Sequence, residues 1–117
     1  MANRRKRGAS GEDIAVDFLG KKGYRIIERN YRFERGEIDI VAEEKDLLVF
    51  IEVKARSTLA FGEPEDAVTV NKRKRIRKVA EGYLFQHNID GKACRFDVVA
   101  IRIDGKCREV HHYENAF

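Results

Sequence analysis

The chain has 117 residues, with 24 Lys and Arg against 20 Asp and Glu, a formal net charge of +4 and 43% hydrophobic residues. This length fits one domain with its own core, and the composition is typical of a soluble globular protein. No apolar run approaches the roughly 18 residues of a membrane helix, and no apolar segment follows the basic N-terminus as in a secretion signal. Two cysteines without CxxC spacing favour a reduced, cytoplasmic protein.

Positive charge is concentrated in two short runs that contain no acidic residue. The first occupies 4–7, and we expect 1–9 to form a basic, flexible N-terminal arm and 10–117 to form a single domain. The second lies in a predicted helix and consists of Lys72, Arg73, Lys74, Arg75, Arg77 and Lys78. A domain polarised in this way suits a polyanion such as nucleic acid. The alternative for the second run is a solvated helix face.

The first half of the chain predicts one helix and three strands. Apolar residues at helical spacing predict a helix over 11–22, with Ser10 as the start of a capping pair. Strands are predicted over 24–33, 36–42 and 47–56, because Ile, Val and aromatic residues alternate there with polar ones.

The second half predicts one helix and two strands. After the non-periodic segment 57–66, which holds the only Pro, apolar spacing predicts a helix over 71–87 with Asn71 as its N-cap. Strands over 95–103 and 107–113 follow, joined by a tight hairpin. The predicted fold class is α/β, a mixed β-sheet flanked by helices in the order α-β-β-β-α-β-β, with a parallel crossover around the second helix.

Acidic residues interrupt the two central predicted strands. Side chains two apart on a strand share a face, so Glu37, Asp39 and Val41 are expected on one face, and Glu52 and Lys54 share a face of the next strand. A carboxylate in a buried strand is costly unless it is paired or bound to a metal, and a divalent cation would relieve the repulsion between two neighbouring carboxylates. The alternative is a structural Glu52–Lys54 ion pair at a sheet edge.

Four other positions carry titratable groups in predicted elements. Glu12 lies at the edge of the apolar face of the first helix and is its acid best placed to reach the sheet, although a favourable interaction with the helix dipole would also explain it. Asp97 interrupts an apolar strand, and we interpret it as a structural acid paired with a helix residue. His111 and His112 are adjacent on a strand and should face opposite sides.

Asp39 followed by Glu52-x-Lys54 on the next strand resembles the D…(D/E)xK signature of the restriction-endonuclease-like nuclease superfamily. The segment 50–56 is similar to the corresponding strand of archaeal Holliday junction resolvases. Over about 8–113 the chain resembles the YraN-type family of uncharacterised bacterial proteins, through Gly11-Glu12, Gly36-Glu37-Ile38-Asp39, the Glu-Val-Lys strand and 95–100. Ile38 departs from the superfamily pattern, in which a proline often precedes the Asp.

The resemblance implies a restriction-endonuclease-like fold and a metal-dependent endonuclease that hydrolyses DNA phosphodiester bonds, with branched or junction DNA as the suggested substrate. Mg²⁺ or Mn²⁺ would polarise the scissile phosphate and activate a water, and Lys54 would orient that water or neutralise phosphate charge. The implied metal ligands are acids and one main-chain carbonyl: Asp39, Glu52, Glu12, Val53 (main-chain carbonyl) and, as the runner-up, Glu37.

The cations of the second basic run, together with Arg56, would bind the nucleic-acid backbone. One alternative is a nucleic-acid-binding module that keeps the nuclease fold without significant turnover, and another is a protein whose charges serve partner binding. A resolvase-like symmetric cut would require a homodimer, and no feature of the sequence establishes one.

Overall fold

The computed structural model describes the backbone of residues 2–56, 69–104 and 107–117, and the side chains of 11–55, 69–103 and 108–117. Two helices and five strands follow the predicted order. They are α1 (Ala2–Lys21), β1 (Arg25–Phe33), β2 (Gly36–Glu44), β3 (Leu47–Arg56), α2 (Val70–Gln86), β4 (Cys94–Asp104) and β5 (Cys107–Tyr113). Neither helix, over the residues that can be described, has the length and apolar character needed to span a bilayer.

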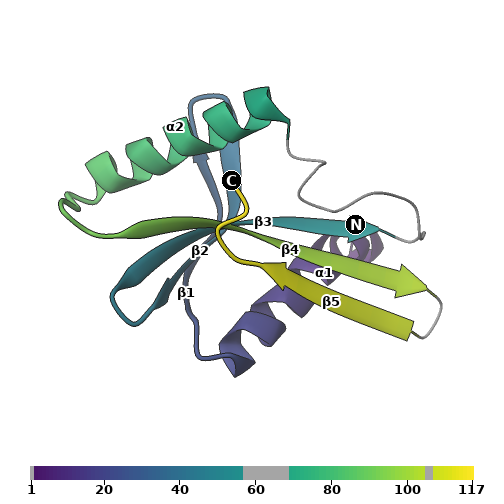
Figure 1. The fold of residues 1–117 in the computed structure, drawn as a ribbon. Helices are drawn as coiled ribbons and strands as arrows, with labels where there is room; N and C mark the ends of the chain where they lie inside the picture. Colours follow the sequence, from purple (N-terminus) through teal and green to yellow (C-terminus); the bar gives the residue numbers. More distant parts are fainter. Residues whose placement is uncertain (1, 57–68, 105–106) are drawn as a thin grey trace.

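The five strands form one mixed sheet in the order β1-β2-β3-β4-β5. Only β3 and β4 are parallel, because α2 connects them, and the other neighbours are antiparallel. The helices lie on opposite faces of the sheet (Figure 1). The predicted α/β class, with a mixed sheet flanked by helices, is confirmed.

Each helix covers its own hydrophobic cluster. On the α2 face, Phe50 and Val98 of the central strands pack with Ile76, Val79 and other buried residues. On the α1 face the corresponding cluster contains residues from α1, from three of the strands and from the segment before β1: Ala15, Leu19, Tyr24, Ile40, Ala42, Val49, Ile51, Val99 and Ile101. Both faces of the central strands are therefore buried, which explains their nearly continuous apolar sequence.

The sheet divides between β2 and β3. Their ladder runs from Glu44 opposite Leu47 to Ile40 opposite Ile51 and ends there. Beyond that point β2 stays paired with β1 as far as Gly36, while β3 stays paired with β4 to the end of the strand. We call this point, where β2 and β3 separate, the fork. Asp39 and Glu52 are the first residues beyond it.

The prediction that successive side chains of β2 alternate strictly between the two faces of the sheet is wrong at this fork. Ile38 and Val41 both belong to the α2-side cluster, whereas Ile40 belongs to the α1-side cluster. Glu37, Asp39 and Val41 therefore do not share one face as the two-residue period predicts. The neighbouring strand β1 is irregular at the same level, where Asn30 has a positive φ of 54°, a conformation that Asn tolerates better than most residues.

Both helices begin earlier than predicted. The first starts at Ala2 rather than near Gly11, so it runs across the predicted boundary between an arm at 1–9 and a domain at 10–117. Ala, Arg and Lys, which are abundant in that segment, all favour helix. The second starts at Val70, with Thr69 as its N-cap accepting from Lys72 N at 3.2 Å, in place of Asn71. The predicted loop 57–66 and the hairpin tip at 105–106 lie outside the described residues.

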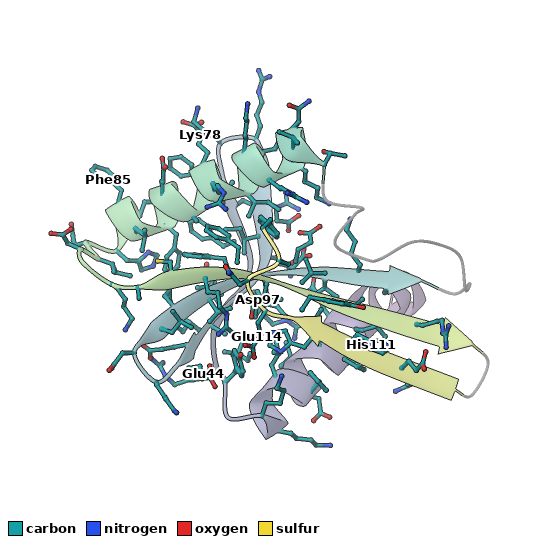
Figure 2. All side chains as sticks on the ribbon, viewed as in Figure 1. Glu44, Lys78, Phe85, Asp97, His111 and Glu114 are labelled. Atoms are coloured by element: carbon teal, nitrogen blue, oxygen red, sulfur yellow. The ribbon has the colours of Figure 1, made fainter. Side chains whose placement is uncertain are left out.

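Asp97 is fully buried near the middle of the sheet (Figure 2). Arg95 donates to both of its oxygens, at 2.8 and 2.7 Å, and the Asn115 backbone N–H donates at 3.0 Å. The ring of His112 lies 2.7 Å from the same carboxylate. Burial alone would raise the pKa of Asp97, but these hydrogen bonds outweigh it and hold the pKa below its usual value. The partners come from strands and the segment after β5, not from a helix as predicted.

Adjacent histidines of β5 face opposite sides of the strand, as expected. The His112 side chain is only 2% exposed and contacts Asp97, while His111 is exposed.

Candidate metal and nucleic-acid site

The fork between β2 and β3 brings two carboxyl groups together. The Val53 backbone N–H lies beyond the end of the β2–β3 ladder and donates to a side chain of β2, Asp39 Oδ2, at 2.8 Å. Glu52 is 8% exposed and lies on the same face of β3 as Phe50, toward α2. The two acids are close enough for a mutual hydrogen bond to favour the protonated form of Asp39.

The environment of Asp39 raises its pKa to about 7. Burial is the largest cause, and the negative charge of Glu52 is the second. The Val53 N–H acts in the opposite direction, and Glu12 adds a further negative charge. Two carboxyl groups that share a partly buried site cannot both ionise freely, so this site is short of positive charge.

Two lysines partly supply that charge. Lys54 Nζ lies 3.5 Å from Glu52 Oε2, and Lys72 Nζ, from the first turn of α2, lies 2.6 Å from the same oxygen. Burial and the neighbouring Lys72 lower the pKa of Lys54. Burial acts against the charged form of Lys72 as well, but its hydrogen bond to Glu52 raises the Lys72 pKa overall.

The two other predicted acidic ligands have partners of their own. Glu12 Oε1 accepts from Arg29 Nη2 at 3.2 Å and from Asn30 Nδ2 at 3.1 Å, yet its charge still acts on Asp39. Glu37 is exposed, and its ion pair is with Arg32 on β1, at 3.6 Å. Over the described side chains, no group of three or more acidic, His or Cys residues is arranged to hold a metal.

The main-chain carbonyl of Val53 faces the fork. In an antiparallel ladder a residue directs its N–H and its C=O toward the same neighbouring strand. Because the Val53 N–H donates to Asp39 of β2, the carbonyl of Val53 is directed to the same side. The geometry thus combines two carboxyl groups and one carbonyl, all hard oxygen donors of the kind that Mg²⁺ and Mn²⁺ prefer.

The basic run of α2 is divided between the site and the surface. Lys72 turns inward to Glu52, whereas Lys74 and Arg75 are exposed. The Arg77 guanidinium lies 4.7 Å from the centre of the Phe96 ring, and Lys78 lies 4.0 Å from Glu34. Arg73 also has a contact within the protein, and the side chain of Arg56 lies outside the described set.

The contact between Lys72 and Glu52 does not follow from the sequence as we interpreted it. We predicted Lys72 as one of six phosphate-binding cations, because it stands in a basic run that contains no acidic residue. The available signal was its spacing, since Lys72 precedes the buried Ile76 by four residues and therefore lies on the inward face of the helix.

These features define a class: an α/β protein with one mixed sheet, whose central strands separate over a carboxyl pair held beside two ammonium groups. The model of the uncharacterised protein family UPF0102 matches residues 11–101. The chain belongs to this family, which is the YraN-type family that the sequence resembles.

Relatives from several bacteria match along most or nearly all of the chain. A UPF0102 protein of Alkaliphilus oremlandii is 47% identical over 115 residues, covering 97% of this chain and 98% of its own. One from Moorella thermoacetica is 50% identical over 101 residues, covering 86% and 84%. One from Dictyoglomus thermophilum is 44% identical over 117 residues, covering 98% and 99%.

Among solved structures, the Pyrococcus furiosus protein SfsA in complex with Ca²⁺ matches 96% of this chain and 63% of its own. The TM-score is 0.37 and the identity is 14%.

Proposed function

We propose that this protein is a metal-dependent nuclease that hydrolyses phosphodiester bonds of DNA. One observation carries the proposal: Asp39 and Glu52 meet where β2 and β3 separate, with the ammonium groups of Lys54 and Lys72 beside them. The two acids, of which Asp39 has its pKa raised to about 7, are suited to bind a cation. The two lysines are suited to bind an anionic substrate.

The residues of the fork fit a hard divalent cation. Asp39, Glu52 and the Val53 carbonyl would hold Mg²⁺ or Mn²⁺, and Glu12 would act on the same ion through its charge or by exchanging its contact with Arg29. When bound, the ion supplies Lewis-acid polarisation of a phosphate oxygen.

The protein's own side chains would then do the rest of the chemistry. Lys54 is partly buried, and burial and the neighbouring Lys72 lower its pKa. It would orient a water for attack on the phosphorus, or donate a hydrogen bond to the phosphate as the negative charge of the phosphate increases. Lys72 would neutralise the second negative charge. The exposed cations of α2 would hold the DNA backbone without reading its sequence.

The decisive experiment is the variant Glu52→Gln, which keeps the size of the side chain and removes its charge. We expect Mn²⁺-dependent cleavage of labelled linear, flap and junction DNA to fall on the order of a thousandfold, with DNA binding largely kept. Glu109→Gln is the matched control, because Glu109 is an exposed acid on β5 that pairs with Arg102. Full activity of the Glu52→Gln variant would refute the assignment.

The same panel distinguishes the second candidate, a nucleic-acid-binding module without turnover. That function is favoured if the wild-type chain binds these DNAs and cleaves none of them with Mg²⁺ or Mn²⁺. The preference among linear, flap and junction substrates then shows whether branched DNA is the substrate class.

A further inference from the structure

A pocket of about 570 Å³ lies between the β1–β2 turn and the N-terminal half of α2. It is lined by the turn residues and by two cations of the helix: Phe33, Glu34, Arg35, Gly36, Arg75 and Lys78. None of the predicted site residues of β2 or β3 lines it, so this pocket is separate from the carboxyl pair.

The walls of the pocket are held by close packing. Gly36 is buried against α2, and a Cβ atom there would lie 2.3 Å from Val79 Cγ2 and 3.2 Å from Arg75 Cγ. On the other side of the turn the Phe33 ring lies against Gly82, whose Cβ would come within 2.5 Å of the ring. Glycine at both contact points lets the turn approach the helix, so the shape of the pocket is built into the fold.

The charge of the pocket is mostly positive. It contains three cations and a single carboxylate, Glu34. Lys78 and Glu34 form only a long contact of 4.0 Å between exposed side chains, which contributes little. Arg35 and Arg75 form no ion pair with any residue in the described part of the chain. Two guanidinium groups with free donors in a shaped pocket favour a phosphate, which arginine binds in a bidentate manner.

The pocket also lies at a suitable distance from the carboxyl pair. Arg75 follows Lys72 by three residues, which is about 4.5 Å along a helix, and Gly36 precedes Asp39 by three residues, about 10 Å along a strand. A nucleic-acid strand rises about 3.4 Å per nucleotide. A strand that crosses the carboxyl pair would therefore reach the pocket within about three nucleotides.

We propose that this pocket binds a backbone phosphate of the nucleic-acid strand, a few nucleotides from the scissile bond, with Arg35 and Arg75 as its donors. The Phe33 side chain supplies an apolar wall for the neighbouring sugar or base. Lys78, which is on the outer side of α2 (Figure 2), adds positive charge at the rim. This inference rests on the proposed function, because it assigns a second contact to the same substrate.

The test measures binding apart from cleavage. Fluorescence anisotropy without added metal compares the wild type with Arg35→Gln and Arg75→Gln on a labelled single strand of about 16 nucleotides, over a range of salt. We expect each variant to bind about fivefold more weakly or worse, with a salt slope reduced by about 0.7 for each phosphate that the variant no longer binds. Arg108→Gln, an exposed arginine on β5, is the matched control for the change in net charge.

The outcomes separate this inference from the proposed nuclease activity. Loss of affinity in both pocket variants and not in Arg108→Gln supports the pocket, even if the wild type proves unable to cleave DNA. If both pocket variants bind the oligonucleotide as tightly as Arg108→Gln does, the pocket inference is overturned, even if cleavage depends on Glu52. An oligonucleotide that fails to bind, while isothermal titration calorimetry detects binding of inorganic phosphate at low millimolar concentration, would show a free-anion site and would also overturn this inference.

Discussion

At the scale of single residues, the central feature is a carboxyl pair that the fold leaves partly buried. Asp39 has a hydrogen bond from Val53 N, but burial and the charge of Glu52 still keep its pKa near 7. Glu52 is compensated by two ammonium groups. The protein thus tolerates a costly group at the fork, which is common where a site serves binding or catalysis.

Replacement of Asp39 by Asn should stabilise the protein at pH 8. The carboxyl titrates at about 7 in the folded chain, against 3.8 as its ordinary value. As the pH rises from about 4 to about 7, the unfolded state loses its proton first, so the wild type loses stability relative to Asp39→Asn. We expect a gain of about 1–3 kcal/mol at pH 8 that shrinks toward zero near pH 4, measured by urea unfolding.

Asp46→Asn provides the control for that series, since Asp46 is exposed in the turn between β2 and β3. Its stability difference from the wild type should stay small at each pH. A gain for Asp39→Asn that does not change between pH 4 and pH 8 would contradict the origin of the effect in ionisation.

Lys72→Gln should bind Mn²⁺ more tightly than the wild type, by about three- to tenfold. Lys72 Nζ lies 2.6 Å from Glu52 Oε2, so the ammonium group competes with a cation for this carboxylate. Isothermal titration calorimetry measures the effect without any substrate. Lys74→Gln makes the same change of charge at an exposed position on the same helix, and equal affinities of the two variants would show that only net charge matters.

The site could be predicted from the sequence in part. Asp39, Glu52 and Lys54 are evident because an acid within an apolar strand is unusual and because their order resembles a nuclease signature. The inward position of Lys72 is not, since a contact between a helix and a strand depends on how the helix lies across the sheet. The prediction of Glu12 near the site agrees with its effect on Asp39, but its hydrogen bonds to Arg29 and Asn30 depend on an irregularity of β1 that periodicity does not encode.

At the scale of elements, the important contact is between α2 and the turn that joins β1 to β2. Two glycines, Gly36 on the strand and Gly82 on the helix, allow the backbone segments to approach closely. This approach sets the position of the basic face of α2 relative to the fork. Since Lys72 reaches Glu52 from the same helix, the packing of α2 also determines the electrostatics of the site.

Gly82→Ala should destabilise the protein by about 1–2 kcal/mol, although alanine is the better helix former. The intrinsic gain is about 1 kcal/mol, but the new Cβ would lie 2.5–2.6 Å from three atoms of the Phe33 ring, and overpacking of this kind costs about 1–3 kcal/mol or more. Gly20→Ala in α1 is the control, because nothing lies within 4 Å of its Cβ position. Urea unfolding should show the two substitutions with opposite signs, and equal stabilisation by both would refute the packing argument.

The order of the elements was predictable because both periodicities are strong in this chain, whereas their ends were not. Ser10 and Gly11 resemble a cap and so predict the start of α1 there, yet the preceding Ala, Arg and Lys residues continue the helix to Ala2. Likewise Thr69, and not Asn71, caps α2. Several residues near a helix start can act as the cap, and tertiary packing decides among them.

At the scale of the whole molecule, charge and hydrophobic burial are arranged on different parts of the fold. Two clusters fill the two faces of the sheet, and cations lie along the outer side of α2, where Lys78 and the exposed Phe85 extend from the helix (Figure 2). Cations near a helix N-terminus oppose the helix dipole. Local stability therefore does not explain this basic face, and we propose that it serves to bind a polyanion.

Neutralising this face should weaken DNA binding while leaving the fold intact. A triple variant of Lys74, Arg77 and Lys78 to Gln should reduce the salt slope of duplex binding by about 0.9 for each phosphate that it no longer neutralises. Its stability should change by no more than about 1 kcal/mol, because removal of the cation–π interaction between Arg77 and Phe96 is offset by the relieved dipole. Binding is measured by anisotropy and stability by urea unfolding.

A second triple variant, Lys21, Lys45 and Arg108 to Gln, controls for the same change of net charge on α1, the β2–β3 turn and β5. Equal salt slopes in the two triple variants would mean that α2 makes no specific contact with DNA and that overall charge alone attracts it.

The partners of Asp97 determine when the polypeptide can complete its interior during synthesis. This carboxylate on β4 needs the His112 ring and the Asn115 N–H, and Ala116 N donates to the carbonyl of the adjacent Phe96 at 2.7 Å. A nascent chain therefore cannot complete the hydrogen bonds of Asp97 until position 115 has left the ribosome, nor that of the Phe96 carbonyl until position 116 has done so. Although α1 and the first three strands are made first, the interior around β4 therefore closes only after β5 and the segment that follows it have been made.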